Sequence, residues 1–331
     1  MLSPYAADAV FSKQARYVKG VSISIFSNFP RFSCESAIQA NLQGVETMRH
    51  DIIEGGGLSY APCRYGMSRI FFRGPKRNLD SPYLAFLGGT ETFGKFIDRP
   101  FPVLIEKELR RTCVNFGCVN GGVDAFVNDP TIMAACHEAD VTIVQAMGAN
   151  YLSNRFYSVH PRRNDRFLHA STVLQAIYKE VDFSDYTFTR HMLGALYEMS
   201  PARFDIVVSE LRAAWVARMR NMLGQIGKRS ILLWFSREEL TDQPWQTREK
   251  PLSIDPLFIT KTMMDGLSDL VLSTVVARPS DIALSQGTTG MYFPLMQAKA
   301  AADMLSVNSH IEASAKLVPK IRDGLSTFYK M

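Results

Sequence analysis

The 331-residue sequence is 47% hydrophobic and 21% charged, a balance that allows a large buried core and excludes global disorder. No apolar stretch reaches the roughly 20 residues that span a bilayer, and the sequence starts without the basic and apolar regions of a secretory signal. The net charge of +5 is modest and no nucleic-acid motif is present, so no nucleic-acid partner is expected.

The cysteines bear on redox state and on metal binding. Their positions are scattered, without Cys-x-x-Cys spacing: Cys34, Cys63, Cys113, Cys118 and Cys136. This pattern predicts reduced thiols in a cytoplasmic protein, with no disulfide framework and no metal site. The sequence also shows no cofactor motif, and it leaves the oligomeric state open.

The first 57 residues have the least regular pattern. Short apolar pieces mix with polar ones, and three glycines follow at Gly55-Gly56-Gly57. Consecutive glycines are typical of a flexible joint. We therefore expect an N-terminal appendage over residues 1–57 and a single domain over residues 58–331, with Met48 as an alternative start.

From Tyr83 onward, strand and helix patterns alternate. Apolar runs predict five strands, at Tyr83–Leu87, Cys113–Phe116, Val141–Met147, Ser230–Phe235 and Leu270–Val276. Helical spacing and capping residues predict helices at Phe101–Arg111, from Asp129-Pro130, near Ser171–Glu180 and Thr187–Glu198, over Pro201–Ile226, after Asp255-Pro256, and over Tyr292–Lys320. This alternation indicates a doubly wound α/β fold. We expect a flavodoxin-like, five-stranded parallel sheet in the order 2-1-3-4-5, with a helical insertion after strand three.

A candidate site follows the first of these strands. Gly88 and Gly89 end the apolar run, and Thr90, Glu91 and Thr92 come next. Ligands bind at the carboxyl edge of open α/β sheets, and glycines there let a ligand approach the backbone. The simpler alternative is that the two glycines only form a tight turn.

Two stretches are rich in arginine. Residues 58–79 contain five basic residues and no acidic one, and residues 155–166 contain the segment His160-Pro-Arg-Arg-Asn-Asp-Arg166. Guanidinium groups bind phosphate, sulfate or carboxylate, so we expect Arg73, Arg162, Arg163 and Arg166 to hold an anionic small molecule or carbohydrate. The alternative is a solvated surface. We further expect Glu91 to pair with Arg73 or Arg163, or else to cap a turn in solvent.

Several of these segments resemble the sequence blocks of the SGNH (GDSL-type) esterases and acetyltransferases. Gly88-Gly-Thr-Glu-Thr-Phe-Gly94 resembles their opening block, Asn115-Phe-Gly117 their second and Gly148-Ala-Asn150 their third, while His310 is similar to their terminal histidine. The resemblance covers roughly residues 83 to 320 and implies an SGNH-like fold.

The resemblance also implies roles for single residues. Thr90 would be the nucleophile or transition-state donor, Gly117 and Asn150 the oxyanion donors, and His310 the base. The residues expected to contact substrate are Gly88, Gly89, Glu91, Thr92, Asn115, Arg73, Arg162, Arg163 and Arg166.

The sequence departs from that pattern at three positions. Thr90 replaces the serine, Gly89 replaces an aspartate, and Val307 stands where an aspartate would orient His310. The imidazole would then take its orientation from Glu312, Asp303 or Glu91.

Three functions follow. The first is a transferase or esterase acting on an ester of an anionic, carbohydrate-type substrate. The second is a catalytically inactive SGNH-like module that binds an anion. The third is a nucleotide-dependent transferase whose Gly-Gly-Thr loop holds phosphate, although the loop lacks the P-loop lysine.

A second resemblance covers most of the chain from about Met48. Pro62-Cys-Arg-Tyr-Gly-Met-Ser-Arg69, the Gly-Gly-Thr-Glu-Thr loop and His160-Pro-Arg-Arg-Asn-Asp-Arg166 resemble a bacterial family of unknown function. We expect the chain to belong to that family, which supplies no reaction.

Overall fold

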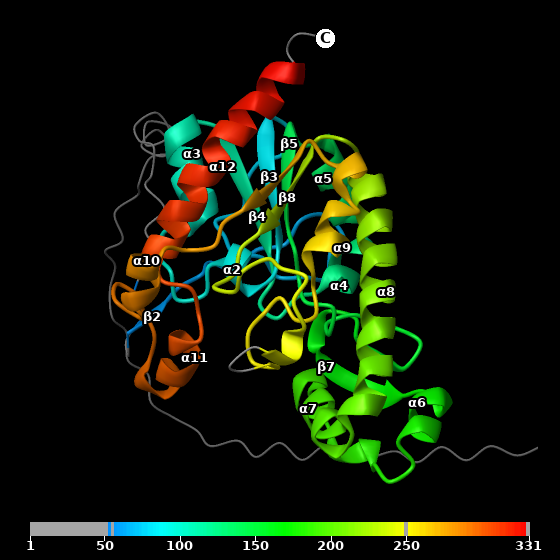
Figure 1. Cartoon of the computed structure of the whole chain (residues 1–331). Coiled ribbons are helices and arrows are strands. Elements are labelled where there is room, and N and C mark those ends of the chain that lie inside the picture. The colour runs from blue at the N-terminus through cyan, green and yellow to red at the C-terminus, as the bar shows by residue number, and fades with distance from the viewer. Residues whose placement is uncertain (1–51, 54–55, 248–250, 329–331) are drawn as a thin grey trace, which may run out of the picture. The chain divides into compact units, whose positions relative to one another are not determined.

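A five-stranded parallel sheet forms the centre of the computed structural model, which describes residues 52–53, 56–247 and 251–328. The strand order is β4-β3-β5-β8-β9 (Figure 1), which is the predicted order 2-1-3-4-5. The strand bounds are β3 (Tyr83–Gly88), β4 (Thr112–Gly117), β5 (Val141–Gln145), β8 (Ser230–Trp234) and β9 (Ser273–Val276). The predicted fold class and topology are thus confirmed.

Helices cover both faces of the central sheet, so every residue of β3, β5 and β8 is buried, whereas the edge strand β9 has only Val275 buried. All six residues of β3 are buried. Leu84 and Phe86 pack with α3 (Phe101–Leu109) and α12 (Val307–Phe328), whereas Ala85 and Leu87 belong to the core on the opposite face. Figure 1 shows α3 and α12 on one side of the sheet and α5 (Pro130–Glu138) and α8 (Pro201–Ile226) on the other.

The remaining α-helices have between four and eleven residues. They are α2 (Thr90–Phe93), α4 (Val123–Val127), α6 (Thr172–Ile177), α7 (Thr189–Met199), α9 (Lys261–Asp265), α10 (Asp281–Ser285) and α11 (Ala298–Ala302), with 3-10 turns at Phe183–Asp185, Trp245–Thr247, Ser268–Leu270 and Leu295–Gln297. The predicted cap of α5 is present, since Asp129 accepts hydrogen bonds from Thr131 N and Ile132 N. The single C-terminal helix predicted from Tyr292 is instead α11 and α12, because Ser306 Oγ accepts from Ser309 N and starts a new helix.

The sequence predicts a purely helical insertion after strand three, which is β5, and this prediction is wrong. The insertion contains an antiparallel hairpin, β6 (Tyr157–His160) and β7 (Arg163–Ala170), followed by α6 and α7. The hairpin and these helices gather at the amino-terminal end of α8 (Figure 1). Tyr157 and Val159 alternate into the core, but the charged residues between the two strands hide this pattern in the sequence.

Two short strands precede the domain core. β1 (Ile52–Ile53) pairs antiparallel with β2 (Gly57–Leu58). Residues 1–51 and 54–55 lie outside the described residues, so the N-terminal appendage over residues 1–57 stays a prediction. Within the described residues, no helix is long and apolar enough to cross a membrane, and no group of three His, Cys, Asp or Glu side chains is placed to hold a metal ion.

Candidate active site

A cleft of about 510 Å³ lies at the carboxyl ends of β3, β5 and β8, the edge at which a doubly wound sheet binds its ligands. Its polar lining comes from elements far apart in the sequence: Glu91 on α2, Gln145 at the end of β5, Arg237 after β8, Arg190 on α7, Asp255 before α9, and Lys299 on α11. With Asp303 and Asn120, which also line it, the cleft brings together three cationic side chains, three acidic ones and two amides.

Gln145 fixes the loop that carries Glu91. Its side-chain Oε1 accepts hydrogen bonds from Gly89 N (3.2 Å), Thr92 N (3.1 Å) and Thr92 Oγ1 (2.6 Å). Gln145 is only 6% exposed, so these bonds form away from bulk water. The single turn of α2 is thus attached to the neighbouring strand, and this attachment sets the direction in which Glu91 points.

Glu91 lies beside His310 at the wall of the cleft. The Oε2 atom of Glu91 is 3.9 Å from Nε2 of His310. His310 is 1% exposed, and its ring stacks on Phe101 at 5.9 Å and meets Phe235 edge-on at 5.1 Å. Its Nδ1 accepts a hydrogen bond from Phe101 N at 3.3 Å. Because Nδ1 acts as the acceptor, the neutral ring carries its proton on Nε2, the nitrogen that faces Glu91.

Burial moves both groups toward their neutral forms. It raises the pKa of the Glu91 carboxyl to about 7, although a backbone hydrogen bond from Leu305 and the charge of Arg237 oppose the shift. It lowers the pKa of His310 to about 3, and the positive charge of Arg73 acts in the same direction. Near pH 7, therefore, the pair consists of a neutral imidazole and a carboxyl group close to half ionised.

Glu91 does not form the ion pair predicted with Arg73 or Arg163. Arg73 is 3% exposed and donates instead to the carbonyl oxygens of Gly94 (2.7 Å) and Asp98 (2.8 Å). The Nη2 atom of Arg163 lies 3.5 Å from Oδ2 of Asp165. Among the residues considered for orienting His310, the structure places Glu91 next to it, whereas Glu312 accepts hydrogen bonds from Ser280.

Thr90 faces away from His310. Its Oγ1 accepts a hydrogen bond from Asn120 N at 2.9 Å and lies 3.4 Å from Asn120 Oδ1. No hydrogen bond joins Thr90 to His310 in the part of the chain that the structure describes. The arrangement needed for threonine attack with a histidine base is therefore not assembled, although Thr90 does line the cleft.

Gly117 and Asn115 hold α2 against β4. The Gly117 N–H donates to Asn115 Oδ1 (2.8 Å), and Asn115 Nδ2 donates to the carbonyl of Thr92 (2.8 Å). A Cβ on Gly117 would lie 2.2 Å from Phe93 N, so this glycine permits a close approach of two backbones. The amide that the resemblance assigns to an oxyanion hole is thus already bonded within the protein.

Asn150 is fully buried and does not line the cleft. Its side-chain Nδ2 and Oδ1 have no hydrogen-bond partner among the described residues, and its backbone carbonyl accepts from the Tyr157 hydroxyl at 2.9 Å. A Cβ on Gly148 would lie 2.4 Å from Asn150 Oδ1, so Asn150 lies beneath the glycine that borders the cleft. It is therefore not placed to contact a reacting atom from this position.

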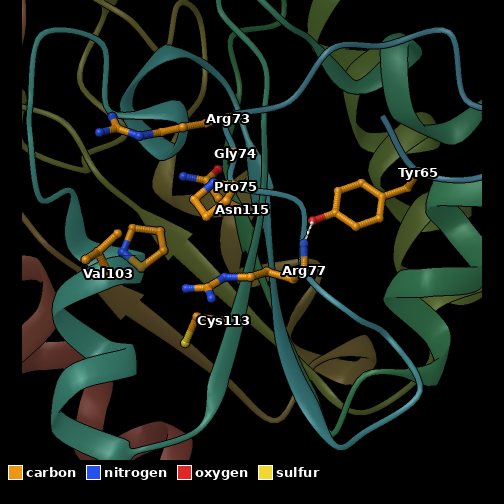
Figure 2. Close-up of a pocket in the computed structure, with 9 residues that line it drawn as sticks. Tyr65, Arg73, Gly74, Pro75, Arg77, Val103, Cys113 and Asn115 are labelled. Atoms are coloured by element: carbon orange, nitrogen blue, oxygen red, sulfur yellow. Dashed lines mark hydrogen bonds between the residues drawn. The ribbon is translucent and has the colours of Figure 1, made fainter. Parts of the chain in front are cut away.

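The arginines predicted to bind substrate are dispersed. Figure 2 shows Arg73 beside Asn115 and Pro75 around a small cavity between β4 and α3. That cavity has a volume of about 20 Å³, roughly that of one water molecule. The guanidinium of Arg166 lies 5.4 Å from the ring centre of Phe188. Arg162 and Arg163 line a different pocket from the one that contains Glu91.

Three important residues of the cleft were not predicted from the sequence. Gln145 has a visible signal, because it is the polar residue that ends an apolar strand. No signal in the sequence marks Arg237 or Arg190, because each lies in a segment of mixed charge. Arg190 Nη2 is 2.7 Å from Asp255 Oδ2 and 3.2 Å from the Tyr151 hydroxyl, so these three side chains form one network across the cleft.

Comparisons with known proteins give one family and two similar structures. The sequence matches the model of a family described as a domain of unknown function (DUF6473) over residues 48–325. No curated protein matches the chain. The lipase Lip_vut3 from a goat rumen metagenome is 15% identical with a TM-score of 0.35, covering 72% of this chain and 97% of its own.

The other similar structure is a carbohydrate esterase family 2 enzyme plus carbohydrate-binding domain from Corynascus thermopiles (Myceliophthora fergusii). It is 11% identical with a TM-score of 0.37, covering 77% of this chain and 69% of its own. The family match includes the predicted motif segments from Pro62 to Arg166. The protein therefore belongs to the family described as a domain of unknown function (DUF6473).

Proposed function

We propose that the protein hydrolyses or transfers the acyl group of an ester, with Glu91 as its general base and acid. The observation that carries this proposal is a largely buried carboxyl group, 19% exposed, with a pKa of about 7 on the wall of a cleft at the ligand-binding edge of the sheet. A group with a pKa near the working pH can both accept and return a proton at useful rates.

The reaction balances with Glu91 alone as the proton carrier. Ionised Glu91 removes a proton from water, or from an acceptor hydroxyl, while the oxygen attacks the ester carbonyl carbon. The C–O bond to the alcohol then breaks, and protonated Glu91 returns the proton to the departing alkoxide. The products are an acid, or a new ester, and an alcohol, and Glu91 is again ionised.

Two neighbours assist this step. His310, held by the N–H of Phe101, directs its own Nε2–H toward the Glu91 carboxyl and acts as a positioning residue rather than as a base. Arg237 lines the same cleft, and its positive charge acts on Glu91. Its Nη2 donates to the carbonyls of Asp303 and Met304, which leaves other guanidinium N–H groups as candidate donors to the developing oxyanion.

For the substrate we propose a carbohydrate-type ester. The cleft offers the acceptors and donors of Asp255, Arg190 and Lys299 together with the rings of Tyr151 and Phe235. Such a mixture of polar groups and rings suits a hydroxylated ligand with an apolar face.

The test uses Glu91→Gln, which keeps the size of the side chain and removes its proton chemistry. Turnover of 4-nitrophenyl acetate and of acetylated sugars by the wild type should exceed that of Glu91→Gln by about 10²–10⁴-fold. The matched control is Glu138→Gln at an exposed position on α5, which should equal the wild type. Equal rates for the wild type and Glu91→Gln would refute the proposal.

A second candidate function is a binding module without catalysis. It is favoured by the hydrogen bond between Thr90 and Asn120, which diverts the hydroxyl from His310. It predicts that no ester is turned over above the Glu91→Gln background while ligand binding is retained. A nucleotide-dependent transferase is not favoured, because the amides of Gly89 and Thr92 bond to Gln145 rather than remaining free for phosphate.

A further inference from the structure

The two arginine-rich stretches, which are separated by 75 residues of sequence, meet in one pocket. This pocket of about 770 Å³ is lined by Arg69 from the first stretch and by His160, Arg162 and Arg163 from the second. We call it the basic pocket. It is separate from the small cavity beside Arg73 and from the cleft that contains Glu91.

The walls of the basic pocket are apolar and largely aromatic. Tyr60, Phe71, Phe72 and Phe93 line it together with Ile70. Tyr60 and Phe93 contact each other, with ring centres 5.0 Å apart, and Phe71 is 59% exposed. A large aromatic side chain left this open, inside a concavity, offers a surface on which a planar or acyl group can pack.

The charge at the rim is positive and mostly uncompensated. Arg69 and Arg162 are exposed and form no ion pair with any residue that the structure describes, whereas Arg163 lies 3.5 Å from Asp165. None of the described residues lining the pocket is acidic. The position of Arg162 is fixed locally, because the backbone N–H groups of Arg162 and Arg163 donate to His160 Nδ1 at 3.2 Å each.

We propose that the basic pocket binds an amphipathic anion, namely an aromatic or short acyl group that carries a sulfate, sulfonate, phosphate or carboxylate. The apolar part packs on Phe71 and its aromatic neighbours, and the anionic part accepts charge-assisted hydrogen bonds from Arg69 and Arg162. The apolar surface disfavours strongly hydrated simple ions, and the guanidinium groups give neutral hydrocarbons no charged partner. The two features together therefore select a ligand that is both apolar and anionic.

Asn120 connects the basic pocket to the cleft. It lines both, and its backbone has a left-handed φ of 56°. Its N–H donates to Thr90, and its Nδ2 donates to Asp165 Oδ2 at 3.2 Å. Asn120 thus lies between the proposed anion in the basic pocket and Thr90 in the cleft. If the anion is part of the ester substrate, that role rests on the proposed function. The binding of an anion in the basic pocket does not depend on it.

The test compares two probes of the same shape, naphthalene-1-sulfonate and the uncharged naphthalene-1-sulfonamide, by isothermal titration calorimetry on the full chain. The sulfonate should bind about tenfold or more tightly than the sulfonamide, because hydrogen bonds to a charged group are stronger than those to a neutral one. The double variant Arg69→Gln/Arg162→Gln should lose this preference. Arg278→Gln, at an exposed arginine outside the pocket, is the matched control and should keep it.

Circular dichroism and melting curves verify that each variant is folded before titration. Equal binding of the two probes, no binding of either at millimolar concentration, or an unchanged preference in the double variant would overturn the proposal. The same titration on Glu91→Gln should match the wild type. Sulfonate binding together with full ester turnover by Glu91→Gln would therefore refute the catalytic proposal and leave the basic pocket standing.

Discussion

Glu91 and His310 face each other across 3.9 Å, and the histidine is held in place by a backbone N–H from the first turn of α3. The usual roles of the two residue types are exchanged here. Burial keeps the imidazole neutral, so it cannot serve as a base near neutral pH, and the carboxyl group takes the pKa that a catalytic histidine normally has. Replacement of Glu91 and replacement of His310 should therefore change different properties of the protein.

Glu91→Gln should stabilise the protein at alkaline pH. The folded-state pKa of Glu91 is raised from 4.5 to about 7, so the unfolded chain loses this proton first and stability falls as pH rises from 4.5 to 7. Above pH 7 ionised Glu91 lowers the free energy of unfolding by on the order of 3 kcal/mol, and glutamine at this position does not. Urea denaturation should show the variant more stable than wild type at pH 8 and equal to it at pH 4.5. A constant difference across this range would contradict the pKa shift.

His310 should occupy one tautomer throughout the physiological range. Its pKa is lowered to about 3, and Nδ1 is the acceptor from Phe101, so nitrogen-15 NMR should show a protonated Nε2 without titration between about pH 5 and 8. Since its folded pKa lies below the unfolded value of 6.5, the stability that His310 contributes should be lost as pH falls from 6.5 toward 3. A titration midpoint near 6.5, or a proton on Nδ1, would be inconsistent with this burial.

Two substitutions of Thr90 separate a positioning role from a nucleophilic one. Thr90→Ser keeps the oxygen that accepts from Asn120 N, and it should retain turnover within about twofold. Thr90→Val removes that oxygen, which should cost about 1 kcal/mol of stability and less than tenfold in turnover. A loss of about 10³-fold or more in Thr90→Val, with the fold intact, would instead assign the nucleophile to Thr90.

Gln145→Met should loosen the loop that carries Glu91. Methionine has a similar volume but cannot accept the hydrogen bonds from Gly89 N, Thr92 N and Thr92 Oγ1. Buried donors without partners cost about 1–3 kcal/mol each, so for three donors we expect a loss of at least about 3 kcal/mol in urea denaturation and a marked fall in turnover. Met147→Leu, which changes a neighbouring cleft residue without removing a hydrogen bond, is the control. A Gln145→Met variant as stable as this control would show that α2 is held by other contacts.

Much of the fold was predictable because its central strands are buried on both faces. A strand such as Tyr83–Gly88 then appears as an uninterrupted apolar run ending at a glycine, and the strand order follows from the doubly wound alternation. The hairpin β6–β7 was missed for the opposite reason. Its second strand carries Arg163, Arg166 and His169 among the buried positions, so charge obscures the buried alternation of the strands.

The location of the site was predictable, but the residue facing His310 was not. Gly88 and Gly89 mark the sheet edge in the sequence, yet consecutive residues on the helical turn that follows point about 100° apart. Whether Thr90 or Glu91 faces the histidine depends on how Gln145 rotates α2, a contact across 53 residues of sequence. Arg73 failed as a predicted partner for a similar reason, since its guanidinium is bonded to backbone carbonyls that only the folded loop assembles.

Carboxyl carbon-13 NMR of glutamate-labelled protein measures the pKa of Glu91 itself, on which its role as a proton carrier depends. The resonance that disappears in Glu91→Gln belongs to Glu91, and its titration in the wild type gives the pKa without any substrate. The midpoint should lie close to the value of about 7 that burial beside neutral His310 produces. A midpoint near the ordinary 4.5 would contradict that role, because the carboxyl group would then be fully ionised at neutral pH and a poor proton carrier.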